Sequence, residues 1–471
     1  MQATMTHDAT LSSLTGLDLR PLEQRLRGTL LRPGMATYDS ARQLMNRAVT
    51  RRPAAIAQVA DSQDVVEVVR FARDRGLPLG VRSGGHSPAG YGMVDDALVV
   101  DLSGMKRVTI DPDARLARVE AGVTSGELAA FAQPHGLAIS TGDTSSVGFG
   151  GLATGGGIGF MVRKYGLTID NLIAAQVVTA SGKLVTASEQ EHPDLFWAIR
   201  GGGGNFGIIT EFIVRLAEVR QILGGDLVLP ASREVIRGYL DYVADAPEGL
   251  TTIAHLMHAP PAPYIPEARV GEVVLSILVT WVGDESEGQR AVAPLRALAE
   301  PVADAIAWMP YPAIFNFTAH QAVPICHRIR SVLTHEVSDE VVDAALEAVE
   351  RVNSPFSLVQ FRGLGGAMAR VGREATAFAH RDARYMVTLL ALWMDENEDA
   401  TPHRAWIEAV WPAIRAIGTG AYVNFLEEEG HERIRQAYPL PTLARLAEVK
   451  RSYDPHNMFR FNQNIAPAMS A

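Results

Sequence analysis

The sequence Arg82-Ser83-Gly84-Gly85-His86-Ser87 follows a short apolar run, Leu77 to Val81. A strand that ends in two glycines exposes consecutive backbone N–H groups, and such groups can bind a pyrophosphate. The motif therefore predicts a strand that leads into a ligand-binding turn and holds His86 close to the ligand. The alternative is an ordinary surface turn with an exposed histidine, and this hexapeptide alone does not decide between them.

Two further segments are rich in glycine. Gly148 to Gly159 holds seven glycines in twelve residues, a density that is rarely kept unless a ligand or another backbone comes close. Gly202 to Gly207 matches G-x-G-x-x-G, but a helical pattern, Pro193 to Arg200, precedes it and a strand pattern, Ile208 to Leu216, follows it. A Rossmann turn instead follows a strand and opens a helix, so the context argues against a nicotinamide cofactor.

Strand and helix patterns surround these motifs in the first half of the chain. Strands are expected at Pro53 to Ala60, Ala97 to Asp101 and Ala114 to Ala121. Helices are expected at Asp61 to Arg73 and at Ser125 to Gln133, the latter capped by Thr124 or Ser125.

The pattern changes near residue 217, where we expect a domain boundary. Beyond it come helical patterns at Ser232 to Ala244, Ser286 to Leu298 and Ser338 to Val352, and strand patterns at Thr251 to His258, Val273 to Trp281, Phe356 to Arg362 and Tyr385 to Met394. This mixture predicts an α+β lobe on a mostly antiparallel sheet. The polar and aromatic end, Tyr453 to Ile465, predicts a return to the first domain. The expected division is 1–217, 218–415 and 416–471.

Composition excludes several classes of protein. A length of 471 residues predicts two domains of roughly 150 to 250 residues, and a formal charge of -10 argues against nucleic acid as a partner. The single cysteine, Cys326, and the absence of metal-ligand spacing among the histidines predict no metal site. Met1 to Gly16 lacks the pattern of a signal peptide, and no apolar run is long enough to span a membrane, so we expect a cytoplasmic protein without membrane contact.

The order and spacing of the glycine-rich segments resemble the berberine bridge enzyme-like branch of the vanillyl-alcohol oxidase/p-cresol methylhydroxylase flavoprotein superfamily. The resemblance covers about residues 40–220 and 420–467, and within the branch it is greatest to the 6-hydroxy-D-nicotine oxidase group. Besides the turn at His86, the matching segments are Gly148 to Leu152, Gly155 to Phe160, Lys164 to Leu167, Asp170-Asn171 and Asp194 to Arg200.

The resemblance implies a two-lobed α+β fold, with an FAD-binding domain of that superfamily's type and a substrate domain whose antiparallel sheet is covered by helices. It also implies that FAD is bound covalently through His86. The residues expected to bind the cofactor are His86, Arg82, Ser83, Gly84, Gly85, Ser87, Ser146, Val147, Gly148, Gly151, Gly156, Gly157, Gly159, Asn205, Gly207, Ile208, Phe461, Asn462 and Asn464.

Two positions of the resemblance bear on the chemistry. Many relatives attach the flavin a second time through a cysteine, but that position is Thr144 here and Cys326 lies in the other domain, so a single attachment is expected. Three positions later the family places a residue over the flavin C4a, where valine admits dioxygen and leucine blocks it. Val147 occupies this position and favours an oxidase.

The segment Ala421 to Phe425 resembles the family's Y-x-N-Y/F motif, which implies that Tyr422 and Asn424 lie near the substrate. Strand alternation would place both side chains on one face. Tyr422 could act as a base only if positive charge or hydrogen bonds lower its pKa; otherwise it orients the substrate, and both roles remain open. The glutamates at 427–429 are expected to be solvated turn charges.

The sheet of the second domain is expected to cover the flavin. Sequence alone does not fix its register, and a slip of one residue exchanges the two faces. The candidate pocket residues are His255 and Met257, or His258 on the other face, with Gln360, Arg362 and Trp393.

These observations predict an FAD-dependent oxidase that transfers a hydride from an alcohol or amine C–H of a small organic molecule to flavin N5, with dioxygen as acceptor. The alternatives are a secondary-metabolite tailoring oxidase or cyclase, and a dehydrogenase with another electron acceptor. A flavin-loaded carrier without a substrate is disfavoured, because it needs neither oxygen access at Val147 nor an enclosed pocket. The substrate and the oligomeric state are beyond the sequence.

Overall fold

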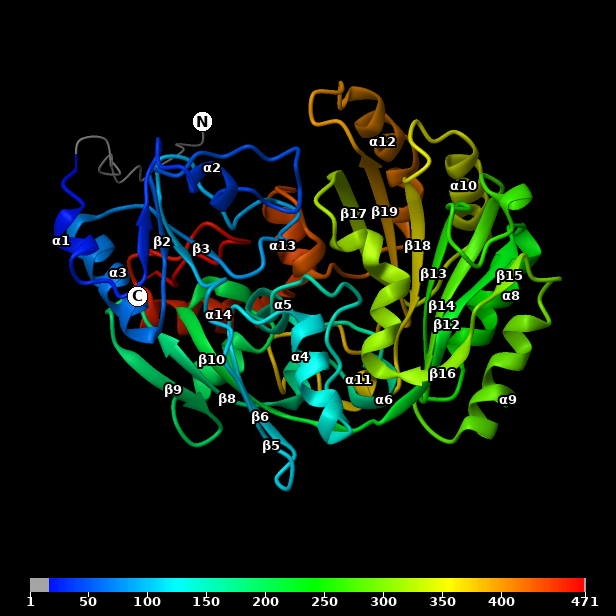
Figure 1. Cartoon of the computed structure of the whole chain (residues 1–471), viewed down its shortest axis with the longest axis horizontal. Coiled ribbons are helices and arrows are strands. Elements are labelled where there is room, and N and C mark those ends of the chain that lie inside the picture. The colour runs from blue at the N-terminus through cyan, green and yellow to red at the C-terminus, as the bar shows by residue number, and fades with distance from the viewer. Residues whose placement is uncertain (1–16, 470–471) are drawn as a thin grey trace.

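The structure is a computed structural model that describes residues 17–469. The expectation about Met1 to Gly16 therefore concerns residues outside the described part. The described chain forms two lobes side by side, and the chain returns to the first lobe after building the second (Figure 1). Helices and strands are mixed in both lobes, which confirms the predicted two-lobed α+β class.

The first lobe contains two main sheets. In one, three parallel strands carry an antiparallel edge strand, in the order β1 (Thr29–Leu31), β2 (Ala55–Gln58), β4 (Leu98–Asp101) and β3 (Leu79–Arg82). The other is antiparallel, in the order β5 (Val108–Asp111), β6 (Leu116–Glu120), β10 (Ile208–Arg215), β8 (Leu172–Val178) and β9 (Leu184–Ser188). A small pair joins β7 (Leu137–Ala138) to β11 (Ala217–Glu218). The strand β3 ends at Arg82, directly before the predicted glycine turn.

Two helices of the first lobe begin at side-chain caps. In α3 (Ser62–Arg75) the Asp61 side chain accepts hydrogen bonds from two backbone N–H groups, and in α4 (Ser125–Ala132) Thr124 is the cap and forms a capping box with Glu127. The remaining helices of this lobe are α1 (Arg20–Glu23), α2 (Tyr38–Ala41), α5 (Phe149–Gly155), α6 (Val162–Tyr165), α7 (Pro193–Ile199), α13 (His431–Ala437) and α14 (Leu440–Tyr453).

The second lobe is built on one antiparallel sheet of eight strands. The four predicted strands form its centre as β13 (Leu250–His258), β14 (Val273–Trp281), β18 (Leu358–Gly363) and β19 (Tyr385–Trp393). The sequence analysis missed four others, which are β12 (Gln221–Pro230), β15 (Ala303–Asp304), β16 (Ala307–Pro310) and β17 (Cys326–Thr334). In β12 the pair Gly224-Gly225 interrupts the alternation, and Gly225 has a φ of +147° that suits glycine.

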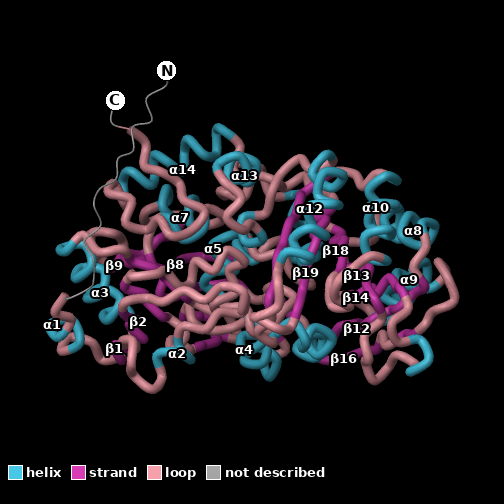
Figure 2. The backbone as a smooth tube through the Cα atoms, turned by 90° about the horizontal axis from the view of Figure 1, so that it is seen from above, coloured by secondary structure: helices cyan, strands magenta, loops and turns pink. Residues whose placement is uncertain are grey.

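The 3₁₀ helix Tyr311–Ala322 packs with Ile222 and Leu278 on one face of this sheet, and four α-helices cover the opposite face. They are the predicted α8 (Arg233–Ala244), α9 (Glu285–Arg296) and α10 (Asp339–Glu350), together with α12 (Thr401–Ala416), which the sequence analysis missed. Their apolar side chains form one core with alternate strand residues such as Leu256, Ile277 and Phe361. Seen from above, these helices lie away from the first lobe, so the other face of the sheet is turned toward it (Figure 2). A short helix, α11 (Ala367–Arg370), contacts α6.

Between residues 17 and 469 no helix is both long and apolar enough to cross a membrane. The same described residues contain no group of three or more His, Cys, Asp or Glu side chains that could hold a metal ion. The single cysteine, Cys326, is buried and free.

Candidate active site

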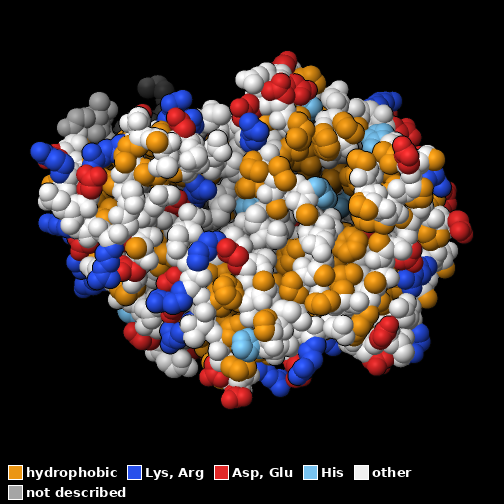
Figure 3. Space-filling model, viewed as in Figure 1, with side chains coloured by type: hydrophobic (Ala, Val, Ile, Leu, Met, Phe, Trp, Pro, Cys, Tyr) orange, Lys and Arg blue, Asp and Glu red, His pale blue; other side chains and the backbone are white. Residues whose placement is uncertain are grey.

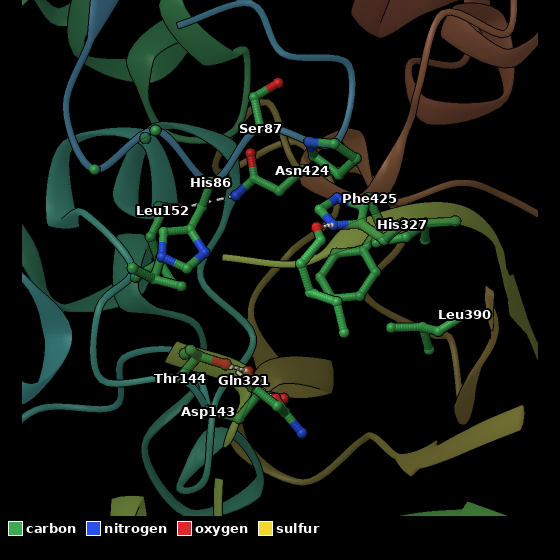
Figure 4. A pocket seen from close by; sticks show the side chains of 18 of the residues that line it. His86, Ser87, Asp143, Thr144, Leu152, Gln321, His327, Leu390, Asn424 and Phe425 are labelled. Carbon is green, nitrogen blue, oxygen red and sulfur yellow. Dashed lines mark hydrogen bonds between the residues drawn. The ribbon is translucent and has the colours of Figure 1, made fainter. Parts of the chain in front are cut away.

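A cavity of about 1160 Å³ lies between the glycine turns of the first lobe and the open face of the second-lobe sheet. In the close view, His86 and Thr144 reach it from the first lobe, while His327 and Leu390 face it from the sheet (Figure 4). The predicted turn and the predicted sheet face therefore share one cavity.

Glycine turns expose backbone atoms in the first-lobe wall. The turn at Gly84 touches the turn at Gly148 so closely that a Cβ on either glycine would overlap the other's backbone. The N–H groups of Gly84, Gly85, His86 and Ser87 donate to no group within residues 17–469. Consecutive free N–H groups in a cavity wall bind anions, so this turn fits the pyrophosphate of FAD.

Open space beside two other glycines also fits a bound cofactor. A Cβ on Gly151 or Gly204 would meet no atom within 4 Å, and both residues line the cavity. Gly207 and Ile208, the start of β10, line it as well.

Three of the expected cofactor glycines do not line the cavity. A Cβ on Gly157 would overlap the Thr168 side chain, and one on Gly159 would overlap the Thr141 carbonyl. Gly156 has a φ of +139° and packs against Phe378 and Tyr422. The density of glycine in this segment thus has two causes: some face the cavity, and others allow chain segments to pack.

The His86 imidazole is held by a hydrogen bond of 2.9 Å between its Nε2 and the Ser146 hydroxyl. Ser146 is outside the cavity lining and reaches it through this contact. Burial lowers the pKa of His86 to about 4, although the nearby Asp143 carboxylate opposes the shift. The imidazole is therefore neutral at pH 7 and keeps a nitrogen lone pair, which a covalent bond to a cofactor requires.

Arg82 and Ser83 hold the turn in place. The Ser83 hydroxyl donates to the Ala121 carbonyl at 2.6 Å. The Arg82 guanidinium donates to the Ala41 carbonyl, and its Nε lies 4.0 Å from Asp101. Both side chains thus bind the protein's own chain, and both residues also line the cavity.

Asn205 joins the third glycine segment to the end of the chain. Its Nδ2 donates to the Gln463 carbonyl at 3.2 Å, and its Oδ1 accepts from the Ile465 N–H at 3.0 Å. The fully buried Lys450 strengthens this junction, since its Nζ donates to the carbonyls of Asn205 and Phe459. These contacts hold the end of the chain against the first lobe.

The closing segment leaves polar atoms without a partner. The side-chain Oδ1 atoms of Asn462 and Asn464 are buried and make no hydrogen bond within the described chain. Buried acceptors of this kind are costly unless a ligand or water satisfies them. Phe461 and Asn462 line the cavity, whereas Asn464 does not. The Asn462 acceptor in the cavity wall fits a cofactor with polar ring edges.

Tyr422 and Asn424 lie together, but not on a strand. Residues Val423–Phe425 form a 3₁₀ helix, so the predicted strand alternation is wrong. The Tyr422 hydroxyl oxygen accepts hydrogen bonds from the Gly157 N–H at 2.9 Å and from Asn424 Nδ2 at 3.0 Å. Burial nevertheless raises the pKa of Tyr422 above its usual value. Of the two roles left open, the geometry favours an orienting residue over a base.

Thr144 and Val147 lie where the two lobes meet over the cavity. The Thr144 hydroxyl donates to Gln321 Oε1 of the second lobe at 3.0 Å. Val147 is half-buried, and both residues line the cavity. A hydroxyl in this contact offers no thiol for a second attachment.

A chain of hydrogen bonds crosses from the first lobe onto the sheet. The Arg362 guanidinium pairs with Asp143, and its Nε donates to Gln360 Oε1 at 2.6 Å. This bond makes Oε1 of Gln360 the acceptor for Arg362, so the Nε2 of the Gln360 amide faces His255. Gln360 Nε2 donates to His255 Nε2 at 2.8 Å. His255 must therefore carry its proton on Nδ1, and burial lowers its pKa to about 3. The imidazole thus lines the cavity as a neutral N–H donor.

The register of the sheet decides the other candidates. Met257 shares the cavity face with His255 and Gln360. His258 also reaches the lining, but its ring nitrogens contact the carbonyls of Gly271 and Val349. Trp393 lies on the opposite face, where it stacks on His403 of α12 with ring centroids 4.6 Å apart. The proposal of Trp393 as a pocket residue was wrong.

The expectation of solvated glutamates at 427–429 was mostly wrong. Glu427 is 3% exposed and pairs with Arg330 at 2.7 Å. Glu429 is also buried and pairs with Arg433 at 3.1 Å. Only Glu428 is exposed. These glutamates were expected to be solvated because the arginines near them in the structure are not their neighbours in this charged segment.

Several cavity residues escaped the sequence analysis. They come from the sheet strands, from loops and from the 3₁₀ helix Tyr311–Ala322, and they include Asp143, Asp226, Ser276, Tyr264, Phe317, Gln321 and His327. Only an alternating apolar and polar pattern in β12 and β17 could have indicated some of these residues. Glycines interrupt this pattern in β12, and charged residues interrupt it in β17.

Comparison with family models gives two matches in this chain. Residues 53–188 match a family described as FAD binding domain. Residues 421–466 match a family described as berberine and berberine like. These segments contain the glycine turn of His86 and the segment of Tyr422.

Relatives match nearly the whole chain. It is 32% identical over 455 residues to the (R)-6-hydroxynicotine oxidase of Paenarthrobacter nicotinovorans, covering 94% of this chain and 97% of the relative. It is 29% identical to the xylooligosaccharide oxidase of Thermothelomyces thermophilus, with 88% of each chain covered.

Solved structures show the same fold. The 6-hydroxy-D-nicotine oxidase of Arthrobacter nicotinovorans superposes with a TM-score of 0.84 at 31% identity, covering 94% of this chain and 98% of the other. The berberine bridge enzyme of Eschscholzia californica superposes with a TM-score of 0.85 at 23% identity, covering 96% and 100%, and this likeness concerns the fold alone.

Proposed function

Because this chain belongs to the berberine bridge enzyme-like family of FAD-linked oxidases, we propose that it oxidises an alcohol or amine C–H bond of a small organic molecule and passes the electrons to dioxygen. When bound, FAD supplies the redox chemistry, by accepting a hydride at N5 and returning two electrons to dioxygen as hydrogen peroxide. The observation that carries the proposal is the single cavity that joins the glycine turns to the polar face of the sheet.

The two lobes are proposed to have different roles. Residues 1–217 and 416–471 would hold the cofactor, and residues 218–415 would contact the substrate. The free N–H groups at Gly84 to Ser87 would bind the pyrophosphate, and the segment with Asn462 and Asn464 would face the ring edge. The remaining expected cofactor residues support this wall through packing or hydrogen bonds.

His86 is the proposed covalent attachment point. Its neutral imidazole, held by Ser146 at the edge of the free N–H turn, supports this role. Thr144 offers no thiol, so one bond is proposed. The attachment would fix the cofactor permanently in the cavity.

Two groups are proposed to handle the substrate. The His255 N–H, fixed by Gln360, would donate to a substrate oxygen or nitrogen and orient the reacting C–H. Tyr422 and Asn424 would support the opposite side of the site. No base is assigned to Tyr422, because burial raises its pKa.

Val147 supports dioxygen as the acceptor, since its side chain leaves more space than leucine at the position where relatives control oxygen access. A dehydrogenase with another acceptor and a tailoring oxidase or cyclase remain the alternatives to be tested.

The test of the proposed function is a screen of alcohols, hydroxylated N-heterocycles, amines and sugars for anaerobic bleaching of the bound flavin. Bleaching by one class, followed by recovery of the yellow colour and release of hydrogen peroxide in air, is the expected result. Bleaching without recovery in air would favour a dehydrogenase. A single product that has gained a ring would favour the cyclase.

A further inference from the structure

A buried carboxylate lies in the cavity wall on β12, two strands away from His255 on β13. Asp226 on β12 is only 4% exposed and lines the cavity. The Ser276 hydroxyl donates to its Oδ1 at 2.8 Å, and the Tyr264 hydroxyl donates to its Oδ2 at 2.9 Å. No Lys, Arg or His side chain within residues 17–469 forms an ion pair with it. A buried carboxylate without a cation is costly, so this one calls for a positively charged partner.

Two aromatic rings border the same part of the cavity. Tyr264 and Phe317 lie with ring centroids 5.7 Å apart and planes inclined by 54°. Both residues line the cavity. Aromatic faces attract organic cations, and they do so most strongly where water is excluded. A carboxylate beside two rings therefore matches an ammonium group better than it matches a neutral hydroxyl.

The register of the sheet places this carboxylate three strand spacings away from Arg362. Asp226 is paired with Leu278, which is paired with Ile253, which in turn is paired with Arg362. The three strand spacings that separate Asp226 from Arg362 add up to about 14 Å. Arg362 is already paired with Asp143. The only unpaired charge in this row is thus Asp226.

The mouth of the cavity is apolar. Val270, Val323, Phe356 and Met394 are all at least 39% exposed and line the cavity. The space-filling view shows hydrophobic side chains gathered around the histidines on this side of the second lobe (Figure 3). An apolar rim favours a substrate with a hydrophobic body over a sugar.

We propose that Asp226 is the counter-ion for the substrate, which is an organic ammonium ion with an apolar body. The inference rests on the proposed function, because it takes this cavity as the place where the substrate binds. Tyr264 and Phe317 flank the ammonium group, and the oxidised C–H lies toward the first lobe. Asp226 determines specificity and takes no part in the chemical step.

Binding of three probes to the holoenzyme tests the proposal without turnover. The probes are 4-phenylbutylamine, 4-phenylbutan-1-ol and 4-phenylbutanoate, which share one apolar body and differ in charge. Calorimetric titration at pH 8 should show the amine binding roughly tenfold or more tighter than the alcohol, and the carboxylate binding weakest. Equal binding of the amine and the alcohol would overturn the proposal.

Substitutions then test whether the preference for the amine depends on the Asp226 carboxylate. Asp226→Asn should abolish the preference for the amine, while Ser276→Ala, which keeps the charge, should retain it. The matched control is Asp241→Asn, which removes an exposed carboxylate of the same lobe. If Asp226→Asn does not bind FAD, Phe317→Leu decides instead, and it should weaken amine binding roughly threefold more than alcohol binding. A preference that survives Asp226→Asn, or equal losses in Phe317→Leu, would overturn the proposal.

Failure of this inference differs from failure of the proposed function. If neutral alcohols bleach the flavin and amines do not bind more tightly, the oxidase function would be supported and the cation site would be contradicted. The opposite outcome is amine binding that depends on Asp226 in a protein whose flavin is reduced by no compound in the screen. That outcome would support the cation site and contradict the proposed oxidase function.

Discussion

The two walls of the cavity are made of different parts of the chain. The first-lobe wall exposes backbone at its glycine turns, with Gly84 against Gly148 and free N–H groups through Ser87. The second-lobe wall is made of side chains, from Asp226 to Arg362, on a regular sheet. A backbone wall needs glycine at fixed spacings, whereas a sheet accepts almost any side chain on its open face. The first wall therefore suits one invariant ligand, and the second can be altered for different substrates.

The largest effect is expected where two backbones touch. Gly84→Ala places a Cβ on the backbone of Gly148, and overpacking of this kind costs about 1–3 kcal/mol. Because the shift moves the N–H groups that face the cofactor, most of the bound FAD should be lost. The ratio of flavin to protein absorbance measures this. Gly372→Ala, where a Cβ meets no atom within 4 Å, is the control and should keep its flavin.

His86→Ala should separate attachment of the cofactor from its binding. The variant should still bind FAD through the turn, but acid precipitation should now release the flavin, which should stay with the wild-type protein. Its oxidation rate should fall by roughly tenfold, or about 1.4 kcal/mol, through a lower flavin potential. The exposed histidine variant His335→Ala serves as control. Release of all flavin from the wild type would contradict the covalent bond.

A substitution on the second-lobe sheet should leave FAD binding by the first-lobe wall unchanged. Gln360→Met removes the bonds that join Arg362 to His255. We expect full FAD content and a fall in kcat/KM of roughly tenfold, because the His255 ring loses its fixed tautomer. Gln360→Glu tests the reason, since it keeps the contact with Arg362 but forces His255 to donate from Nε2. Loss of flavin from Gln360→Met would break the distinction between the two walls.

Val147→Leu should affect only the reaction with dioxygen. Reoxidation of the reduced flavin should slow by roughly tenfold, while anaerobic reduction by the substrate should remain nearly unchanged. Stopped-flow measurement separates these two half-reactions. Unchanged reoxidation would remove the main support for an oxidase and favour a dehydrogenase.

The smallest effect is expected from Thr144→Cys. The new thiol would lie where relatives carry a cysteine, so it should form a second bond to the flavin with little change in FAD content. Mass spectrometry of the flavin peptide detects this bond. An unmodified thiol would mean that the backbone at this position follows a different path from that of the relatives, or that the alignment is shifted by a residue.

Local patterns predicted the elements that local rules govern. The cap at Thr124, the strand before Arg82 and the central strands of the second sheet were all predicted from neighbouring residues. The strand β12 was missed because its glycines break the alternation, and the glutamates at 427 and 429 were misjudged because Arg330 and Arg433 pair with them across the fold.

The family and the glycine turns near His86 could be recognised from the chain alone, because the spacing of these glycines is a local requirement of the turns they build. The second-lobe wall depends on how distant strands pair. This pairing set the register that turned His255 and Gln360 toward the cavity and Trp393 away from it. It also brought Asp226 into line with Arg362 across three strands. The reason is that strand pairing joins residues that are distant along the chain, and a register that differs by one residue reverses every face.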